Sequence, residues 1–163
     1  MPQSTLSEVS VSRGREVDRR TRSKGAAHPS FPPRFTLPAE LRALARYRPK
    51  LVFDLLFASA SETLQELARD ECHLGAVLGI TAVLHTWTRD LRFHPHVHCI
   101  VTGGGLSLDG TRWISARKKF LFHVLVMGEL LRGKMLDGLR AVHESGVLDG
   151  FDEFDDPEGF DRL

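Results

Sequence analysis

The sequence predicts an α+β domain in which an antiparallel sheet is flanked by helices, with a disordered tail at each end. Residues 77–87 and 96–102 alternate apolar and polar side chains as strands do, and a connection of hairpin length joins them. Residues 50–71 and 124–144 instead place their apolar side chains on one helical face. The two ends of the chain show neither period, so the core is predicted to lie between them.

The length and composition fit one domain with tails. The chain has 163 residues, of which 42% are hydrophobic and 26% are charged, and these proportions permit a core. No stretch is apolar enough for a membrane span or a secretory leader. The two cysteines, Cys72 and Cys99, are too few for a disulfide framework or a four-cysteine zinc site. We therefore expect a cytoplasmic protein with no membrane partner.

Residues 1–34 are predicted to be a basic tail without regular structure. They are rich in serine and arginine, and three closely spaced prolines end the segment, Pro29, Pro32 and Pro33. The predicted core covers 35–148 and begins with a short β-prone stretch at 35–37, which Pro38 ends. Residues 149–163 hold seven acidic side chains and form a predicted acidic tail.

Two helices are predicted in the first half of the core. Residues 39–47 form the first, and residues 50–71 form the second, with its apolar positions on one face. Pro49 separates them, because proline lacks an N–H donor and clashes with the preceding turn.

In the second half of the core, three glycines at 103–105 are predicted to end the strand at 96–102. A short strand is expected at 112–114. The third helix, at 124–144, is predicted to end at a cap formed by Gly146.

Charge is segregated along the chain, although the formal net charge is only +1. Residues 1–50 carry eleven Lys and Arg against four Asp and Glu, and residues 111–140 carry seven against two. Such basic blocks can meet a polyanion, or they can be solvated. The basic residues that we expect to contact DNA phosphates are Arg112, Arg117, Lys118 and Lys119.

Histidines concentrate the chemistry of the chain. His94, His96 and His98 alternate along a predicted strand, which places them on one face about 6–7 Å apart. His85, on the neighbouring predicted strand, can face the same side. Neutral imidazoles at this spacing can converge on a divalent ion and leave positions open for catalysis; a packing role is the alternative. Pro95 interrupts the strand, so His96 and His98 form the safer pair.

The other aromatic residues are expected to be structural. Trp87 and Trp113 are predicted to pack in the core, with base stacking as the alternative. The single tyrosine, Tyr47, is also expected to be structural. So are the remaining histidines, His28, His73, His123 and His143.

An ordered series of motifs surrounds the histidines. The motifs are Thr-Ala-Val-Leu-His-Thr-Trp at 81–87, His-Pro-His-Val-His-Cys-Ile-Val at 94–101, Gly-Gly-Gly-Leu-Ser at 103–107 and Asp-Gly-Thr-Arg-Trp at 109–113. Phe-Thr-Leu-Pro-Ala-Glu-Leu at 35–41 and Leu-Arg-Gly-Lys at 131–134 support them. Over about 35–148, the series resembles the rolling-circle insertion-sequence transposases of the 91/801 type, which form the two-tyrosine class of the HUH superfamily.

The resemblance implies a HUH-endonuclease-like fold and metal-assisted cleavage of single-stranded DNA at transposon ends. His96-Val97-His98 matches the His-hydrophobic-His motif, which holds Mg²⁺ or Mn²⁺ together with a third polar ligand. In the family the metal polarises the scissile phosphate, and a tyrosine attacks it to form a phosphotyrosine link. His85 is the first candidate for the third ligand, His94 the second, and Asp90 a weaker one. Imidazole ligands also leave Zn²⁺ open.

The chain departs from the family in two respects. Its only tyrosine, Tyr47, lies far upstream of the histidines, and residues 1–34 contain no cysteine for the family's zinc-binding segment. We therefore expect an internal transposase fragment with an incomplete fold and no catalytic nucleophile. Such a fragment would keep metal and DNA binding without cleaving DNA alone.

Two other functions remain open. No membrane partner is expected for these functions or for the transposase hypothesis. The first is a histidine-triad nucleotide hydrolase, because His94, His96 and His98 alternate as in that family. Pro95 and the surrounding motifs argue against this hydrolase. The second is a non-enzymatic metal-binding or structural module. Under the transposase hypothesis, no small-molecule substrate is expected.

Overall fold

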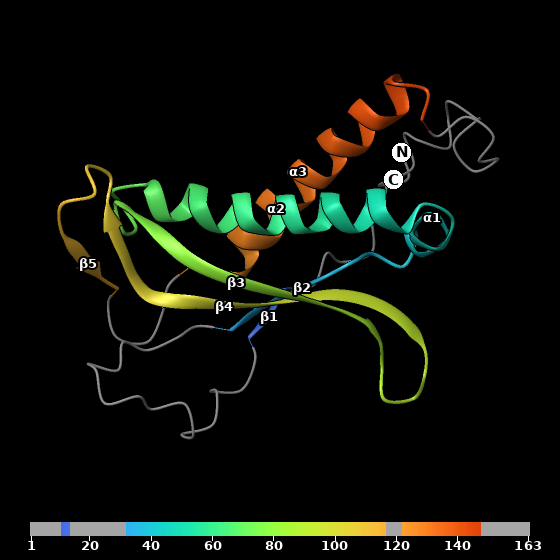
Figure 1. The fold of residues 1–163 in the computed structure, drawn as a ribbon, viewed down its shortest axis with the longest axis horizontal. Coiled ribbons are helices and arrows are strands. Elements are labelled where there is room, and N and C mark those ends of the chain that lie inside the picture. The colour runs from blue at the N-terminus through green and yellow to red at the C-terminus, as the bar shows by residue number, and fades with distance from the viewer. Residues whose placement is uncertain (1–10, 14–31, 117–121, 148–163) are drawn as a thin grey trace.

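The computed structural model describes residues 11–13, 32–116 and 122–147, and its helices lie on one face of an antiparallel sheet (Figure 1). This arrangement confirms the predicted fold class. In chain order, the elements are β1 (Val11–Arg13), β2 (Pro33–Thr36), α1 (Arg42–Tyr47), α2 (Pro49–Arg69), β3 (Ala76–Trp87), β4 (Phe93–Ser107), β5 (Trp113–Ser115) and α3 (Val124–Glu144).

The central strand of the sheet is β4. Strand β3 pairs with it along one edge, while β2 and β5 pair with different stretches of the other edge, and all these pairs are antiparallel. Strand β1 extends the sheet beyond β2. The long β3–β4 hairpin therefore forms the framework on which the other strands are arranged.

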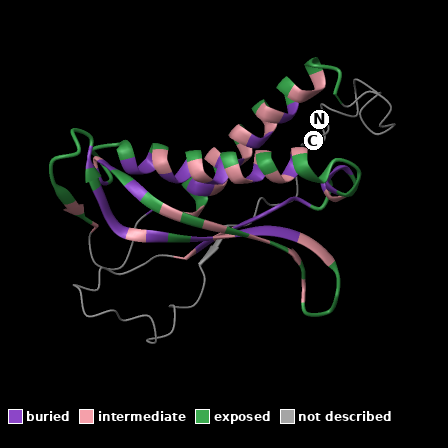
Figure 2. Cartoon of the chain, viewed as in Figure 1, coloured by how far each residue is buried: buried purple, intermediate pink, exposed green. Residues whose placement is uncertain are grey.

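The core lies between the sheet and the helices, as the buried positions show (Figure 2). Val97, Cys99 and Val101 of β4 are fully buried, and the alternating residues of β3 on the same face pack against this core. The helices contribute their apolar stripes, which include Val52, Leu56, Ala60 and Leu64 of α2 and Met127, Leu131, Met135 and Leu139 of α3. The period-2 and helical patterns in the sequence thus predicted the correct faces.

The helices follow the sequence signals closely. Pro49 occupies the first turn of α2, where its missing N–H costs nothing, and Arg48 separates α2 from α1. Helix α3 has the predicted limits, and Gly146 follows it with φ +71° and an N–H donated to the His143 carbonyl over 3.0 Å. Helix α1 begins at Arg42, three residues later than predicted. None of the described helices is both long and apolar enough to cross a membrane.

The predicted end of the second long strand at 103–105 is wrong, because β4 continues through these glycines to Ser107. A Cβ atom at Gly104 would lie 2.4 Å from the Ile114 carbonyl oxygen, and one at Gly105 would lie 2.3 Å from the Val77 carbonyl oxygen. The glycines are therefore needed because β5 and β3 both approach β4 closely here, not because the chain turns.

The sequence also gave no signal for β1, which lies inside the segment predicted to have no regular structure. Its three residues are too few to show an alternating pattern, and the strand is defined by its pairing with β2. The remainder of the predicted tails, at 1–10, 14–31 and 149–163, lies outside the described residues.

Candidate metal site on the open face of the sheet

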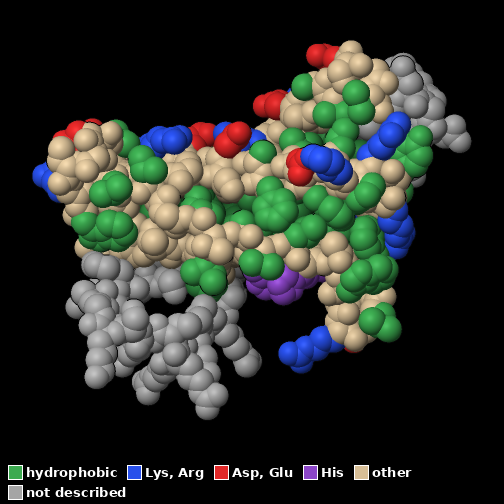
Figure 3. Space-filling view, viewed as in Figure 1, with side chains coloured by type: hydrophobic (Ala, Val, Ile, Leu, Met, Phe, Trp, Pro, Cys, Tyr) green, Lys and Arg blue, Asp and Glu red, His purple; other side chains and the backbone are tan. Residues whose placement is uncertain are grey.

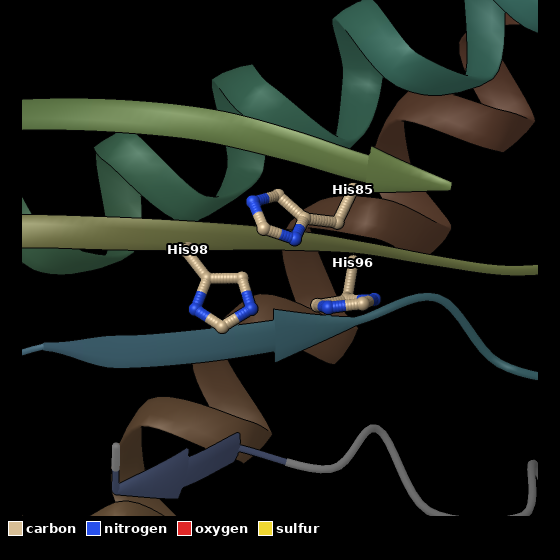
Figure 4. Close-up of side chains that lie close together, drawn as sticks. All are labelled: His85, His96 and His98. Carbon is tan, nitrogen blue, oxygen red and sulfur yellow. The ribbon is translucent and has the colours of Figure 1, made fainter. Parts of the chain in front are cut away.

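Three histidines lie together on the face of the sheet that the helices leave open. His85 of β3 is the register partner of His96 of β4, and His98 lies two residues further along β4. Their side chains point toward one another in Figure 4, and histidine is visible on the surface away from the helices in Figure 3. The structure thus brings together the pair His96 and His98 and the first candidate for a third ligand.

The spacing of the three rings suits a shared ion. Ring centroids lie 4.5 Å apart for His85 and His98, 4.8 Å for His96 and His98, and 5.4 Å for His85 and His96. One ring nitrogen from each residue lies within 4.8 Å of the other two. Nitrogens that share a tetrahedral ion lie about 3.3 Å apart, so small side-chain rotations would complete the geometry.

The ring of His96 is oriented by the backbone. Its Nδ1 lies 2.7 Å from the carbonyl oxygen of His94. A carbonyl oxygen only accepts, so Nδ1 carries the proton and Nε2 presents its lone pair. This is the second contact that histidine ligands commonly make in metal sites. The arrangement would hold His96 ready as a ligand through Nε2.

Burial favours the neutral form of two of these imidazoles, those of His96 and His98. It is the main cause that lowers the pKa of His96 and of His98, and the positive charge of Arg34 lowers the pKa of both further. The hydrogen bond to the His94 carbonyl opposes this shift for His96. Neutral imidazole is the form that binds metal ions, so these rings need not release a proton near neutral pH.

His94 is adjacent to His96, with ring centroids 5.4 Å apart, but it is not one of the three residues whose ligand atoms come together. Its Nδ1 is 3.0 Å from Nη2 of Arg42, and since a guanidinium only donates, His94 accepts this bond. The pairing of β3 with β4 shifts register between His85 and Trp87, so that His94 and Pro95 face one residue of β3. The predicted interruption at Pro95 is present, but β4 already begins at Phe93.

The weakest candidate for the third ligand is also placed elsewhere. Asp90 lies in the exposed turn between β3 and β4, where its carboxylate pairs with Arg92 at 2.9 Å. Among the described residues, the geometry therefore favours His85 over His94 and Asp90.

Two arginines lie beside the histidines, and the sequence analysis did not predict either of them as a site residue. Arg34 of β2 is the register partner of His98, and Arg42 holds His94. The Nε atoms of Arg34 and Arg42 are buried and have no hydrogen-bond partner among the described residues. Such a cationic surrounding favours an anionic ligand. Arg34 lies beside His98 only because β2 pairs with β4, and no local sequence pattern predicts this pairing.

The family comparison identifies the chain. Residues 79–162, about half of the chain, match the model of the family Y2_Tnp, described as "Putative transposase". The chain belongs to this transposase family. The match runs through the acidic segment 149–162 as well as the histidine motif. The predicted resemblance to rolling-circle transposases of the 91/801 type is confirmed.

Two relatives of the chain are transposases that it matches over part of their length. It is 44% identical over 119 residues to "Putative transposase y4qJ" of Sinorhizobium fredii (strain NBRC 101917 / NGR234), a match that covers 73% of this chain and 30% of that protein. It is 40% identical over 89 residues to "Transposase for insertion sequence element IS801" of Pseudomonas savastanoi pv. phaseolicola, covering 55% of this chain and 20% of that protein. The transposase chain thus spans less than a third of either relative.

The fold of the transposase chain is similar to that of the conjugative relaxase TrwC in complex with oriT DNA. A metal-bound structure of TrwC gives a TM-score of 0.51 at 13% identity, covering 77% of this chain and 48% of that chain. A metal-free structure gives 0.55 at 16%, covering 77% and 49%. At this identity the likeness shows a common fold, and it confirms the predicted HUH-like architecture.

Both tryptophans of the transposase chain differ from the prediction that they pack in the core. Trp87 is 57% exposed and Trp113 is 43% exposed. The alternating burial along β3 puts Trp87 in phase with His85, at an exposed position of the strand. Trp113 lies beside β4, with its Nε1 only 2.8 Å from where a Cβ of Gly104 would be.

The predicted DNA-contacting cluster is only partly described. Arg112 is exposed in the turn between β4 and β5, at the other end of β4 from the histidines. Arg117, Lys118 and Lys119 lie outside the described residues. Contact of these four residues with DNA stays a prediction.

The described residues that we expected to be structural have local contacts. His73 packs edge-on against Phe122 with ring centroids 5.8 Å apart, and His123 accepts a hydrogen bond from the Leu125 N–H at the start of α3. The guanidinium of Arg48 lies 4.8 Å from the ring centroid of Tyr47. His28 lies outside the described residues.

Proposed function

We propose that this chain supplies the metal centre of a transposase that cleaves and transfers single-stranded DNA at transposon ends. His85, His96 and His98 would hold a divalent ion. The observation that carries the proposal is the convergence of three ring nitrogens on the open face of the sheet, in a member of a transposase family. A relaxase of the same fold has a metal-bound structure with DNA, which supports it. Action on DNA would place the chain in the cytoplasm.

The donor set indicates which ions fit. All three candidate ligands are imidazoles, which suit Mn²⁺ or Zn²⁺ better than Mg²⁺, an ion that prefers oxygen ligands. When bound, such an ion would polarise a phosphoryl oxygen as a Lewis acid. We infer Mn²⁺ as the first ion to test, with Zn²⁺ and Mg²⁺ as competitors.

The surrounding residues would bind and orient the DNA. Arg34 and Arg42 have guanidinium groups next to the histidines, and a guanidinium matches the geometry of a phosphate. The contact between Arg42 and His94 would fix His94 as an Nε2–H donor toward the same region. We propose that these groups hold the phosphate backbone while the histidines hold the ion.

We assign no nucleophilic role to Tyr47. It is half-exposed at the end of α1, and its ring lies beside the guanidinium of Arg48. We propose that the chain alone binds metal and single-stranded DNA without completing strand transfer. An assay for a covalent protein–DNA product after incubation with single-stranded DNA tests this. A product that Tyr47→Phe abolishes would contradict it.

A thermal-unfolding titration with Mn²⁺ tests the metal centre. An ion that binds only the native state raises the melting temperature, with a gain of about 2.7 kcal/mol in unfolding free energy at a hundredfold excess over Kd. We expect this rise for the original chain and His94→Ala, and its loss in His85→Ala and His98→Ala. His94→Ala is the matched control, because His94 lies on the same strand outside the cluster. A cooperative transition indifferent to all three ions would contradict the metal assignment.

Neither alternative function gains support from the structure. The histidine-triad hydrolase would use His94 with His96 and His98, whereas His94 is bound to Arg42 and the family match is to transposases. A module that only binds metal would show the Mn²⁺ response without affinity for single-stranded DNA. Measuring DNA binding on the same samples therefore separates this possibility from the proposed function.

A further inference from the structure

An exposed tryptophan lies close to the candidate metal site. Trp87 follows His85 by two residues on the same side of β3, about 6–7 Å further along the strand. Its side chain is 57% exposed, although burying an indole is strongly favourable. An exposed indole next to a candidate phosphate site favours binding of a ligand that buries its surface.

Trp87 contacts a second aromatic ring across the hairpin. Phe93 is its register partner across the hairpin, and the two rings meet edge to face with centroids 5.4 Å apart. The guanidinium of Arg46 in α1 lies 4.7 Å from the centroid of Phe93. The register shift at His94 and Pro95 is what brings Phe93 opposite Trp87. The indole is therefore held in place while much of its surface stays in solvent.

The turn that follows Trp87 exposes a second apolar side chain. Leu91 is 80% exposed, and it is the one non-glycine residue with positive φ (55°) in the described part of the chain. Two backbone hydrogen bonds close the turn, from Thr88 to the Arg92 carbonyl and from Leu91 to the Thr88 carbonyl, each 3.0 Å long. Glycine would adopt this conformation without steric cost, so a leucine here indicates a use for its side chain.

The charge around this hairpin end is suited to a polyanion. Arg89 and Arg92 lie in the turn, and the guanidinium of Arg46 lies against Phe93, the residue that follows the turn. One carboxylate, Asp90, is paired with Arg92. Figure 1 shows the end of the β3–β4 hairpin curving away from the helix layer, toward the open side of the sheet.

We propose that Trp87 and Leu91, here called the hairpin platform, form a nucleobase-binding surface for single-stranded DNA. Trp87 stacks on the base of a nucleotide next to the phosphate at the histidines, and Leu91 contacts the following nucleotide. The inference rests on the proposed function, because it takes DNA as the ligand of this face. Every base offers a π face, so the platform binds single strands without strict sequence preference. Paired bases are already stacked, so a duplex cannot use it.

The platform is tested by measuring the affinity of the full chain for a labelled oligothymidine single strand. The measurement is made in the presence of a chelator. Stacking on one aromatic side chain accounts for a roughly 5- to 150-fold difference in affinity, so Trp87→Ala is expected to weaken binding by a factor in this range. Trp113→Ala is the matched control, since Trp113 is exposed at the other end of β4. Trp87→Phe, which keeps a ring, is expected to restore most of the affinity.

A fully abasic strand distinguishes the loss of base stacking from a change in the structure of the variant. Trp87→Ala and the original chain are expected to bind this strand equally, because no base remains to stack. A loss on the abasic strand equal to that on the intact strand would overturn the proposal. So would equal affinity of Trp87→Ala and Trp113→Ala for the intact strand, or no binding of the intact strand by the original chain.

Fluorescence locates the contact directly. The chain has two tryptophans, so Trp113→Phe reports only Trp87 and Trp87→Phe reports only Trp113. DNA is expected to quench the first variant and not the second; the reverse would overturn the proposal. The Mn²⁺ titration is independent of both readouts. Quenching of Trp87 without a Mn²⁺ response would leave the platform standing and remove the metal centre, whereas a Mn²⁺ response without quenching would do the opposite.

Discussion

Gln65 of α2 exchanges two hydrogen bonds with the backbone of Leu78 in β3. Its Nε2 donates to the Leu78 carbonyl over 2.9 Å, and its Oε1 accepts the Leu78 N–H over 3.2 Å. The register between β3 and β4 shifts directly after Leu78. One side-chain amide thus does what a neighbouring strand would do, and it ties the helix layer to the hairpin that holds the histidines.

Gln65→Ala is expected to destabilise the chain by about 1–3 kcal/mol, because it removes two hydrogen bonds to a partly buried backbone. Urea-induced unfolding measures the change. Glu62→Gln, on the same helix, is the control: it loses only a long, exposed ion pair with Lys134 (3.8 Å) and is expected to stay within about 0.5 kcal/mol. Equal stabilities of the two variants would show that Leu78 finds other partners.

Alanine is expected to have opposite effects at two glycines. Gly104→Ala would push a Cβ against the Ile114 carbonyl, so we expect a loss of about 1–3 kcal/mol in unfolding free energy. Gly133→Ala, in α3 with open space around the position, is expected to gain about 0.5–1 kcal/mol through helix propensity. Urea unfolding compares both with the original chain, and a neutral Gly104→Ala would mean that β5 moves away freely.

The Asp109 carboxylate is expected to stabilise the turn between β4 and β5 in a pH-dependent manner. Hydrogen bonds from the Ser107 hydroxyl and from Thr111 lower its pKa from 3.8 to about 2. Because the folded pKa is the lower one, the stabilisation is present above about pH 4 and disappears as the pH falls toward 2. The melting temperature of Asp109→Asn should lie below that of the original chain at neutral pH, and the difference should vanish in acid. A difference that persists near pH 2 would point to another cause.

The two thiols are expected to react at very different rates. Cys72 is exposed, whereas Cys99 is fully buried in the core, and burial raises the pKa of its thiol to about 11. An aromatic disulfide reagent should modify one thiol quickly in the native chain and the second only on unfolding, since the thiolate is the reactive form. In Cys72→Ser no fast reaction is expected. Rapid modification of Cys99 would contradict the packing of β4 against the helices.

Arg34 is expected to contribute one phosphate contact to DNA binding. Arg34→Gln should weaken the binding of single-stranded DNA and reduce the slope of log K against log salt by about 0.7, the value for one contact with a single strand. Lys50→Gln is the control, because Lys50 is exposed and paired with Asp54 on α2. An unchanged slope in Arg34→Gln would show that the backbone follows another path.

Part of the candidate site was predictable because it depends on local periods. The alternation of β4 put His96 and His98 on one face and Val97 and Cys99 on the other, and the structure has this arrangement. That His85 lies opposite His96, and not one residue away, depends on the register shift at His94 and Pro95. A shift of one residue would turn His85 to the other face, and no local pattern fixes it.

Local patterns along the chain were enough to predict the limits of α3, the buried faces of α2 and β4, and the family motifs, because each depends on residues that are neighbours in the sequence. The pairing of strands and the packing of helices, by contrast, place Arg34 beside His98 and Arg42 beside His94, leave Trp87 exposed, and put the glycines at 103–105 within a strand. Register, close approach of strands and residual exposure depend on partners far apart in the chain. These relationships exist only once the sheet has formed.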